Sequence, residues 1–301
     1  MNFTAKDVQS LREKTGAGMM DCKKALTEAD GDMEKAVDVL REKGLASAAK
    51  KASRIAAEGV VVTYYDEAAK VASMVEVNCE TDFVAKNEKF VELANKIAVT
   101  VAEKNPADVD ALLATTLSGS DEVVSDAVQE LFLTIRENMK VRRVVRVEGV
   151  VASYIHGGGS VGVLVNFDTD VADKDEFVTC GKDVAMQIAA LGTQYLNRDD
   201  VPAEVIEHEK EVMKTQVINE GKPEAIADKI VMGKINKYYK ENCLVDQEFV
   251  KDNKMTVKQY VDSVAKSIGG TITITGFARF EKGEGIEKRQ DDFAAEVASM
   301  V

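Results

Sequence analysis

The spacing of apolar and polar side chains changes sharply near residue 80. Within residues 71–79, four apolar side chains keep one parity (Val71, Val75, Val77 and Cys79) while Glu76 and Asn78 take the other, which predicts a strand with one buried face. Farther on, apolar positions recur at helical spacing until an Asn-Pro pair ends the pattern: Phe90, Leu93, Ala94, Ile97 and Val101. A strand-to-helix corner is therefore predicted at the four residues between the two patterns: Thr81, Asp82, Phe83 and Val84.

This corner combines a carboxylate with a large aromatic side chain, and two interpretations are open. In the first, Asp82 accepts hydrogen bonds from the free amides of the following helix and Phe83 packs beneath that helix. In the second, both side chains point outward and contact another molecule. Caps are the commoner feature, so the pattern alone favours the first interpretation. The first interpretation predicts that the Phe83 ring is buried, whereas the second predicts that it is exposed.

Residues 1–44 show three short amphipathic patterns, each closed by a glycine. Thr4 and Asp7 form a helix-start signal, and the first helix is predicted to end at Gly16. The third carries apolar residues at positions i, i+3, i+4 and i+7 and is predicted to end at Gly44. Three such helices predict a small bundle of the ubiquitin-associated (UBA) type.

The second helix of this bundle begins with two adjacent methionines, Met19 and Met20. Neighbouring helical residues point about 100° apart, so both cannot face the same core stripe. One of them is expected at the surface, where a methionine suits an adaptable contact. The alternative is that both side chains are tucked into the small core.

The central part of the chain contains an internal repeat. The tetrapeptide at residues 58–61 recurs unchanged at residues 148–151, and the matched segments that follow keep an offset that falls only from 90 to 87 residues. Each copy is typical of two strands followed by a helix, so the sequence predicts an α+β fold with two related halves and antiparallel sheets. At the corner of the second copy, Val171 stands where the first copy has Phe83.

Further apolar stripes supply a covering layer for each half. One predicted helix of the first half carries the stripe Val124, Val128, Leu131, Ile135 and Met139. In the second half, a predicted helix over residues 257–268 precedes a strand over residues 271–280. We therefore predict six segments: an N-terminal UBA-like domain and linker (1–54), the first core repeat (55–145), the second core repeat (146–195), an inserted helical hairpin (196–242), the remainder of the second core subdomain (243–280) and a C-terminal module (281–301).

The inserted hairpin follows from two long, mostly polar helical patterns joined at Gly221-Lys222-Pro223. Its apolar stripe is too narrow to be fully buried, and a solvated antiparallel pair of helices is one interpretation of it. At the C-terminus another short apolar stripe predicts an amphipathic helix: Phe293, Val297 and Met300.

The charge of the chain argues against binding to nucleic acid. The formal net charge is −13, whereas nucleic-acid binders concentrate Lys and Arg. Residues 1–54 carry 11 Lys and Arg against 9 Asp and Glu, which leaves −15 for the rest. The Ala-rich connector over residues 45–57 bears three basic residues without aromatic neighbours, which is typical of a solvated linker face. A protein partner is therefore expected.

No motif in the sequence supports metal, cofactor or catalytic chemistry. The four cysteines form no C-x-x-C pair and are expected to be buried free thiols, and two histidines are too few for a metal cluster or an acid-base array. Residues 157–162 satisfy G-x-G-x-x-G but join two strand-like runs, so they predict a hairpin loop rather than a dinucleotide site. With no leader pattern and no membrane-length apolar run, a non-enzymatic cytoplasmic protein without membrane contact is expected.

Two motifs are specific enough to indicate a family. Residues 15–26 read TGAGMMDCKKAL and residues 78–86 read NCETDFVAK, and on these motifs the chain resembles bacterial elongation factor Ts over essentially its whole length. The resemblance implies a factor that promotes guanine nucleotide exchange on elongation factor Tu and makes or breaks no bond.

The resemblance also implies roles for individual residues. Asp82 and Phe83 would enter a groove of the Tu GTPase domain near its Mg²⁺ site, held by Thr81 and Val84. A second surface would be formed by the N-terminal helices and a third, at a hairpin tip, by one histidine: Arg12, Met19 and Met20, then His156. In some members the inserted hairpin forms a homodimer. The alternative function is a scaffold that uses the N-terminal bundle to bind peptides, and such a scaffold would tolerate the loss of Phe83.

Overall fold

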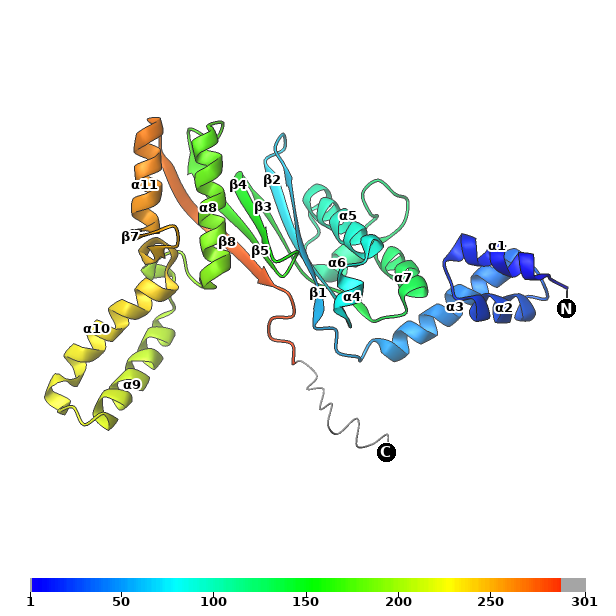
Figure 1. Ribbon diagram of the computed structural model, residues 1–301, viewed down its shortest axis with the longest axis horizontal. Helices are drawn as coiled ribbons and strands as arrows, with labels where there is room; N and C mark the ends of the chain where they lie inside the picture. The colour runs from blue at the N-terminus through cyan, green and yellow to red at the C-terminus, as the bar shows by residue number, and fades with distance from the viewer. Residues whose placement is uncertain (1, 288–301) are drawn as a thin grey trace.

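The computed structural model describes residues 2–287, and the N-terminal helices and a helical hairpin lie at opposite ends of a central body (Figure 1). The N-terminal bundle comprises α1 (Ala5–Thr15), α2 (Met19–Glu28) and α3 (Met33–Lys51). Thr4 and Asp7 form a reciprocal capping box at the start of α1, and Gly16 ends that helix in the left-handed conformation. The predicted start and stop of the first helix are thus confirmed.

The predicted end of the third helix at Gly44 is wrong. Helix α3 continues to Lys51 and takes in most of the predicted connector. Gly44 is buried against α7 (Val124–Ile135), where a β-carbon would lie only 2.0 Å from Leu133 Cδ2. The glycine therefore permits two helices to approach closely instead of ending one of them.

The central body consists of two three-stranded antiparallel sheets packed face to face. The first has the order β1 (Glu58–Asp66), β2 (Val71–Cys79), β3 (Met139–Glu148), and the second has the order β4 (Val150–His156), β5 (Val161–Thr169), β8 (Ile272–Glu281). Each copy of the sequence repeat thus forms two antiparallel strands and a helix, as predicted. A small pair of strands, β6 (Glu248–Phe249) and β7 (Asp252–Thr256), lies apart from both.

Helices cover the two outer faces of this sheet pair (Figure 1). On the first sheet lie α5 (Glu88–Lys104), α6 (Val109–Leu113) and α7, and on the second lie α8 (Asp175–Leu191) and α11 (Val257–Ile268). Between the sheets is a separate apolar cluster: Val61, Ala72, Met74, Val151 and Leu164. The body therefore has the layer order helix, sheet, sheet, helix, as expected for an α+β fold.

The prediction that β2 has only one buried face is wrong. All nine residues of β2 are buried, including Glu76 and Asn78. The odd-numbered positions pack on α5, while the even-numbered positions face the second sheet and the turn after β8. Glu76 and Asn78 are polar without facing solvent, because their side chains form hydrogen bonds inside the protein.

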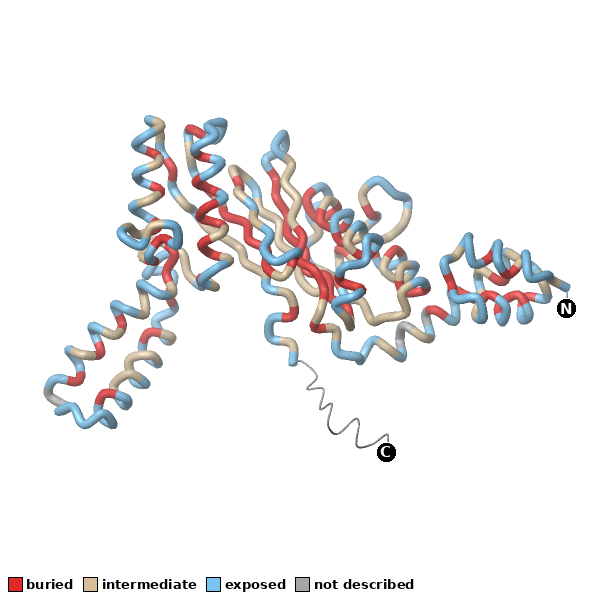
Figure 2. Tube along the Cα trace, in the orientation of Figure 1, coloured by how far each residue is buried: buried red, intermediate tan, exposed pale blue. Residues whose placement is uncertain are grey.

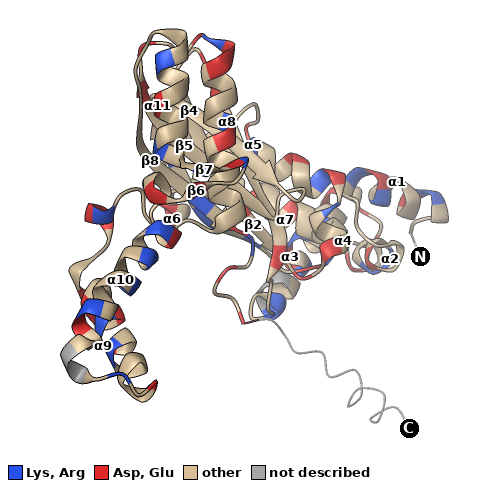
Figure 3. Ribbon diagram, turned by 60° about the vertical axis from the view of Figure 1, so that its left-hand side comes forward, with Lys and Arg blue, Asp and Glu red and all other residues tan. Residues whose placement is uncertain are grey.

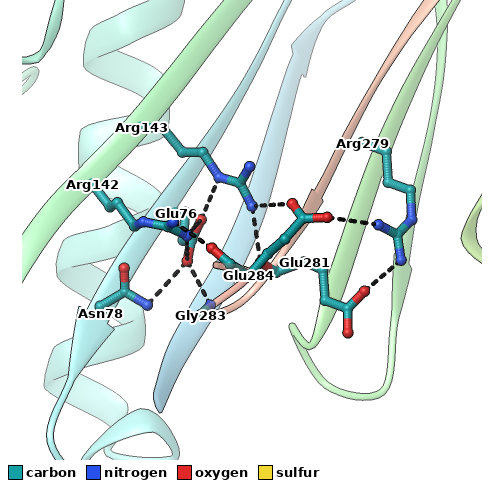
Figure 4. Close-up of polar contacts among 8 residues, drawn as sticks. All are labelled: Glu76, Asn78, Arg142, Arg143, Arg279, Glu281, Gly283 and Glu284. Carbon is teal, nitrogen blue, oxygen red and sulfur yellow. Dashed lines mark hydrogen bonds and ion pairs between the residues drawn. The ribbon is translucent and has the colours of Figure 1, made fainter. Parts of the chain in front are cut away.

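The buried Glu76 carboxylate is the centre of a polar cluster that joins the two halves (Figure 4). It accepts hydrogen bonds from Arg142 Nη1 at 3.1 Å, from Asn78 Nδ2 at 3.0 Å and from the Gly283 amide at 2.8 Å, and it pairs with Arg143. Burial acts to raise the Glu76 pKa, but these donors outweigh it and hold the pKa below its usual value. Further ion pairs extend the cluster: Arg143 with Glu284, and Arg279 with Glu281 and Glu284.

The predicted long helix that included Met139 is also shorter than expected. Helix α7 ends at Ile135 because Arg136 takes the left-handed conformation, with φ of 67°. Met139 instead begins β3, a strand that the sequence analysis did not predict. A register shift in the β2–β3 pairing between Glu76 and Val77 breaks the alternation that would have revealed this strand.

The predicted helical hairpin is present and projects from the second half as α9 (Ala203–Asn219) and α10 (Glu224–Asn242). Short 3-10 turns, η1 (Arg198–Asp200) and η2 (Leu244–Asp246), flank it. Buried residues are dense in the sheets and sparse along the hairpin (Figure 2). The predicted apolar stripe of residues 293–300 lies outside the described part of the chain.

Candidate functional site

The corner after β2 forms a separate one-turn helix, α4 (Asp82–Ala85). Thr81 is its N-cap, and the Thr81 hydroxyl accepts a hydrogen bond from the Val84 amide at 3.4 Å. Val84 and Ala85 are buried against the core of the first half. The turn is therefore held from beneath, and its remaining side chains face outward.

Phe83 is 83% exposed, the largest exposed fraction among the large hydrophobic side chains described. Asp82 does not cap a helix; its carboxylate accepts a hydrogen bond from Lys86 Nζ at 2.7 Å, and this contact lowers the Asp82 pKa. The interpretation of the corner as a cap with a packed ring is thus wrong: Thr81 supplies the cap, and the ring is not packed. An exposed aromatic ring beside an ionised carboxylate is typical of a contact surface.

Two acidic side chains that the sequence analysis did not single out brace this corner. Glu137 accepts hydrogen bonds from both the amide and the hydroxyl of Thr81, at 3.0 and 2.8 Å. Glu80 accepts one from the Asn138 amide at 2.6 Å and pairs with Arg54. No sequence signal links these residues, because 56 positions separate Glu137 from Thr81.

The predicted N-terminal contact residues lie at the surface of the bundle. Arg12 on α1 is exposed, and on α2 Met19 is 45% exposed and Met20 62% exposed. Both methionines are therefore outside the core, which excludes the alternative that both are buried. Lys and Arg are interspersed with Asp and Glu on these helices (Figure 3), so the surface is not a basic one.

His156 lies at the end of β4, where the chain turns into β5. Its ring is exposed and its Nδ1 is 3.2 Å from the Tyr154 hydroxyl oxygen. The glycines of the turn take positive φ, and Gly159 O accepts a hydrogen bond from the Val61 amide at 2.8 Å. The glycine motif therefore joins two strands, as predicted, and the tip is tied to the first half.

Within residues 2–287, no three His, Cys, Asp or Glu side chains are grouped so as to hold a metal ion. All four cysteines are free and buried, as predicted. Burial and the nearby Glu137 carboxylate raise the pKa of the Cys79 thiol to about 12, so this thiol beside the corner is protonated at neutral pH. Over the same residues no helix has the length and apolar character to cross a bilayer.

Comparison with known proteins agrees with this geometry. The family described as Elongation factor TS matches residues 80–284. A protein named Elongation factor Ts from Clostridium perfringens (strain SM101 / Type A) is 55% identical over 301 residues, which cover 99% of each chain. Another of that name, from Clostridium botulinum (strain ATCC 19397 / Type A), is 53% identical over 299 residues, or 98% of this chain and 97% of the relative.

The chain belongs to the elongation factor Ts family. It is therefore a translation elongation factor of protein biosynthesis. Each of the two motifs noted in the sequence includes exposed side chains: Met19 and Met20 on α2, and Phe83 on α4.

Proposed function

We propose that this protein is a guanine nucleotide exchange factor for elongation factor Tu and acts in the cytoplasm. The observation that carries the proposal is the 83% exposed ring of Phe83 on a turn anchored by Thr81 and Val84. Exposing a phenyl ring to water is unfavourable, so an anchored exposed ring is best explained by a partner that buries it. The proposed partner site is a groove of the Tu GTPase domain near its Mg²⁺ ion.

The proposed mechanism is a coupling between two binding equilibria. A bound guanine nucleotide is held by backbone amides around its phosphates and by Mg²⁺, which bridges phosphate oxygens. Insertion of Phe83, with the Asp82 carboxylate beside it, displaces the elements that hold the metal and the phosphates. Linkage makes this antagonism reciprocal, so the factor weakens GDP binding and nucleotide weakens factor binding. Each ~1.4 kcal/mol of antagonism changes affinity tenfold. No bond is made or broken in the protein.

Further contacts to Tu are proposed for the N-terminal surface and the hairpin tip: Arg12, Met19 and Met20, and His156. The helical hairpin is proposed to support a homodimer in solution. Large apolar side chains exposed on α9 and α10 favour this arrangement: Val212, Ile218, Ile226 and Met232. Sedimentation of the purified protein over a range of concentrations tests it, and a monomer at every concentration contradicts it.

The exchange activity is tested by release of a fluorescent GDP analogue from purified elongation factor Tu. Catalytic amounts of wild type should accelerate release strongly, and Phe83→Ala should lose most of that acceleration. Val178→Ala is the matched control, because Val178 is also an exposed apolar side chain, 58% exposed, on a helix of the second half. No acceleration by wild type contradicts the assignment. Full activity of Phe83→Ala favours the scaffold alternative for this corner.

A further inference from the structure

The turn between α7 and β3, residues 136–138, touches three parts of the protein at once. Arg136 donates a hydrogen bond to Asp21 of α2 at 2.7 Å. Glu137 accepts the two hydrogen bonds from Thr81, and Asn138 Nδ2 donates to the Arg54 carbonyl at 2.8 Å. One short turn therefore holds the N-terminal bundle, the linker that follows α3, and the corner that carries Phe83.

The corner depends on such anchors because α4 has only four residues. A single helical turn does not form by itself, since nucleation fixes several dihedral angles for one hydrogen bond. Beneath α4 lie the buried Val84 and Ala85, and at its start lies the Thr81 cap. A carboxylate that binds both donors of Thr81 fixes the cap residue in two directions and so sets the direction of the turn.

The second copy of the repeat shows what differs at the first. There Asp170, the counterpart of Asp82, accepts hydrogen bonds from the amide and hydroxyl of Thr271, at 2.7 and 3.1 Å, just before β8. In the first copy the contact runs the other way: Glu137, just before β3, supplies the carboxylate to Thr81. Asp82 instead accepts a hydrogen bond from Lys86 and lies at the surface beside Phe83.

We infer that Glu137 is a positioning residue for nucleotide exchange: it holds Thr81 so that α4 presents Asp82 and Phe83 to the partner. This inference rests on the proposed exchange function. The position of the Glu137 carboxylate, rather than its charge, carries the role. A side chain of the same length that accepts from the Thr81 amide therefore suffices, and a shorter carboxylate does not.

Three substitutions of Glu137 test this in the GDP-release assay with elongation factor Tu. Glu137→Ala should lower the maximal release rate about tenfold, the size expected for losing the hydrogen bonds that Thr81 donates. Glu137→Gln should stay near wild type, and Glu137→Asp should resemble Glu137→Ala. Asp170→Ala is the matched control, because it removes the equivalent threonine contact from the second copy and should leave release unchanged.

A double-mutant cycle with Phe83→Ala separates positioning from general destabilisation. If Glu137 acts by placing Phe83, Glu137→Ala should change the rate less than about twofold once Phe83 is already absent. The inference is overturned if Glu137→Ala promotes GDP release at the wild-type rate, or if Glu137→Asp preserves activity and Glu137→Gln does not. It is also overturned if the effects of Glu137→Ala and Phe83→Ala on the release rate multiply in the double mutant. If wild type does not accelerate GDP release, the proposed exchange function fails. If wild type is active and Glu137→Ala is equally active, only the inference about Glu137 fails.

Discussion

Phe83 and Val171 occupy the same place in the two copies of the internal repeat, one residue after a Thr-Asp pair, yet Phe83 is 83% exposed and Val171 only 7%. Val171 closes the core of the second half, where it packs with Phe177 and Ile272. Phe83 belongs to no hydrophobic core cluster of residues 2–287. Duplication therefore produced one corner that stabilises the fold and one that is available to a partner.

Exchanging the side chains at positions 83 and 171 should affect the free energy of unfolding unequally. Phe83→Val should change the free energy of unfolding by less than about 0.5 kcal/mol, because the ring is at the surface. Val171→Phe should destabilise by about 1–3 kcal/mol, because its site is already filled. The packing there is tight: a β-carbon on Gly270 would lie 2.3 Å from Val171 Cγ1. Urea unfolding of both variants measures the difference, and equal effects contradict it.

The Glu76 cluster should make the free energy of unfolding depend on pH in the acidic range. Because the folded-state Glu76 pKa lies below its usual value of 4.5, its contribution is fully present above about pH 4.5 and is lost as pH falls through the folded-state pKa. Glu76→Gln should cost about 3 kcal/mol at pH 7, because it leaves two arginines without their buried partner.

The difference between wild type and Glu76→Gln should therefore shrink as the pH is lowered toward 3, in urea unfolding at several pH values. Glu92→Gln is the control, since Glu92 forms an exposed pair with Lys96 on α5 and its loss should leave stability unchanged. A Glu76 effect that is independent of pH would show that the Glu76 pKa is not lowered in the folded protein.

The four cysteines should be unreactive in the folded protein. All are buried, and burial raises the pKa of the Cys79 and Cys180 thiols to about 12 and that of Cys243 to about 11. At pH 8 a thiol with pKa near 12 is ionised in only about one molecule in 10⁴. Titration with a chromogenic disulfide should thus label almost no thiol in buffer and all four in guanidinium chloride. Rapid labelling in buffer contradicts this prediction.

Two glycines inside helices should respond oppositely to alanine. In α10 a β-carbon on Gly233 would have no neighbour within 4 Å, so Gly233→Ala should stabilise that helix by up to about 1 kcal/mol. In α3 the same change at Gly44 would collide with Leu133 and weaken the contact between α3 and α7. Gly44→Ala should therefore speed tryptic cleavage after Lys51 and Arg54, whereas Gly233→Ala should not. Equal cleavage rates would mean that Leu133 moves aside freely.

Local patterns determined much of this fold. The repeat at residues 58–61 and 148–151 predicted the two related halves, and the Thr4 and Asp7 signal predicted the start of α1. Helical spacing predicted α5 and α11. These succeed because capping and amphipathic periodicity depend on residues within one or two turns.

Contacts between distant residues decided the rest. Helix α3 passes through Gly44, where the missing β-carbon leaves room for Leu133 of α7. Glu76 is buried because two arginines from β3 neutralise its carboxylate. The sequence by itself determined the repeat, most of the helices and strands, and the presence of an aromatic residue at the corner. Only the tertiary structure decided that Phe83 is exposed, because Thr81 is held by a carboxylate 56 residues away, and no local pattern encodes such a contact.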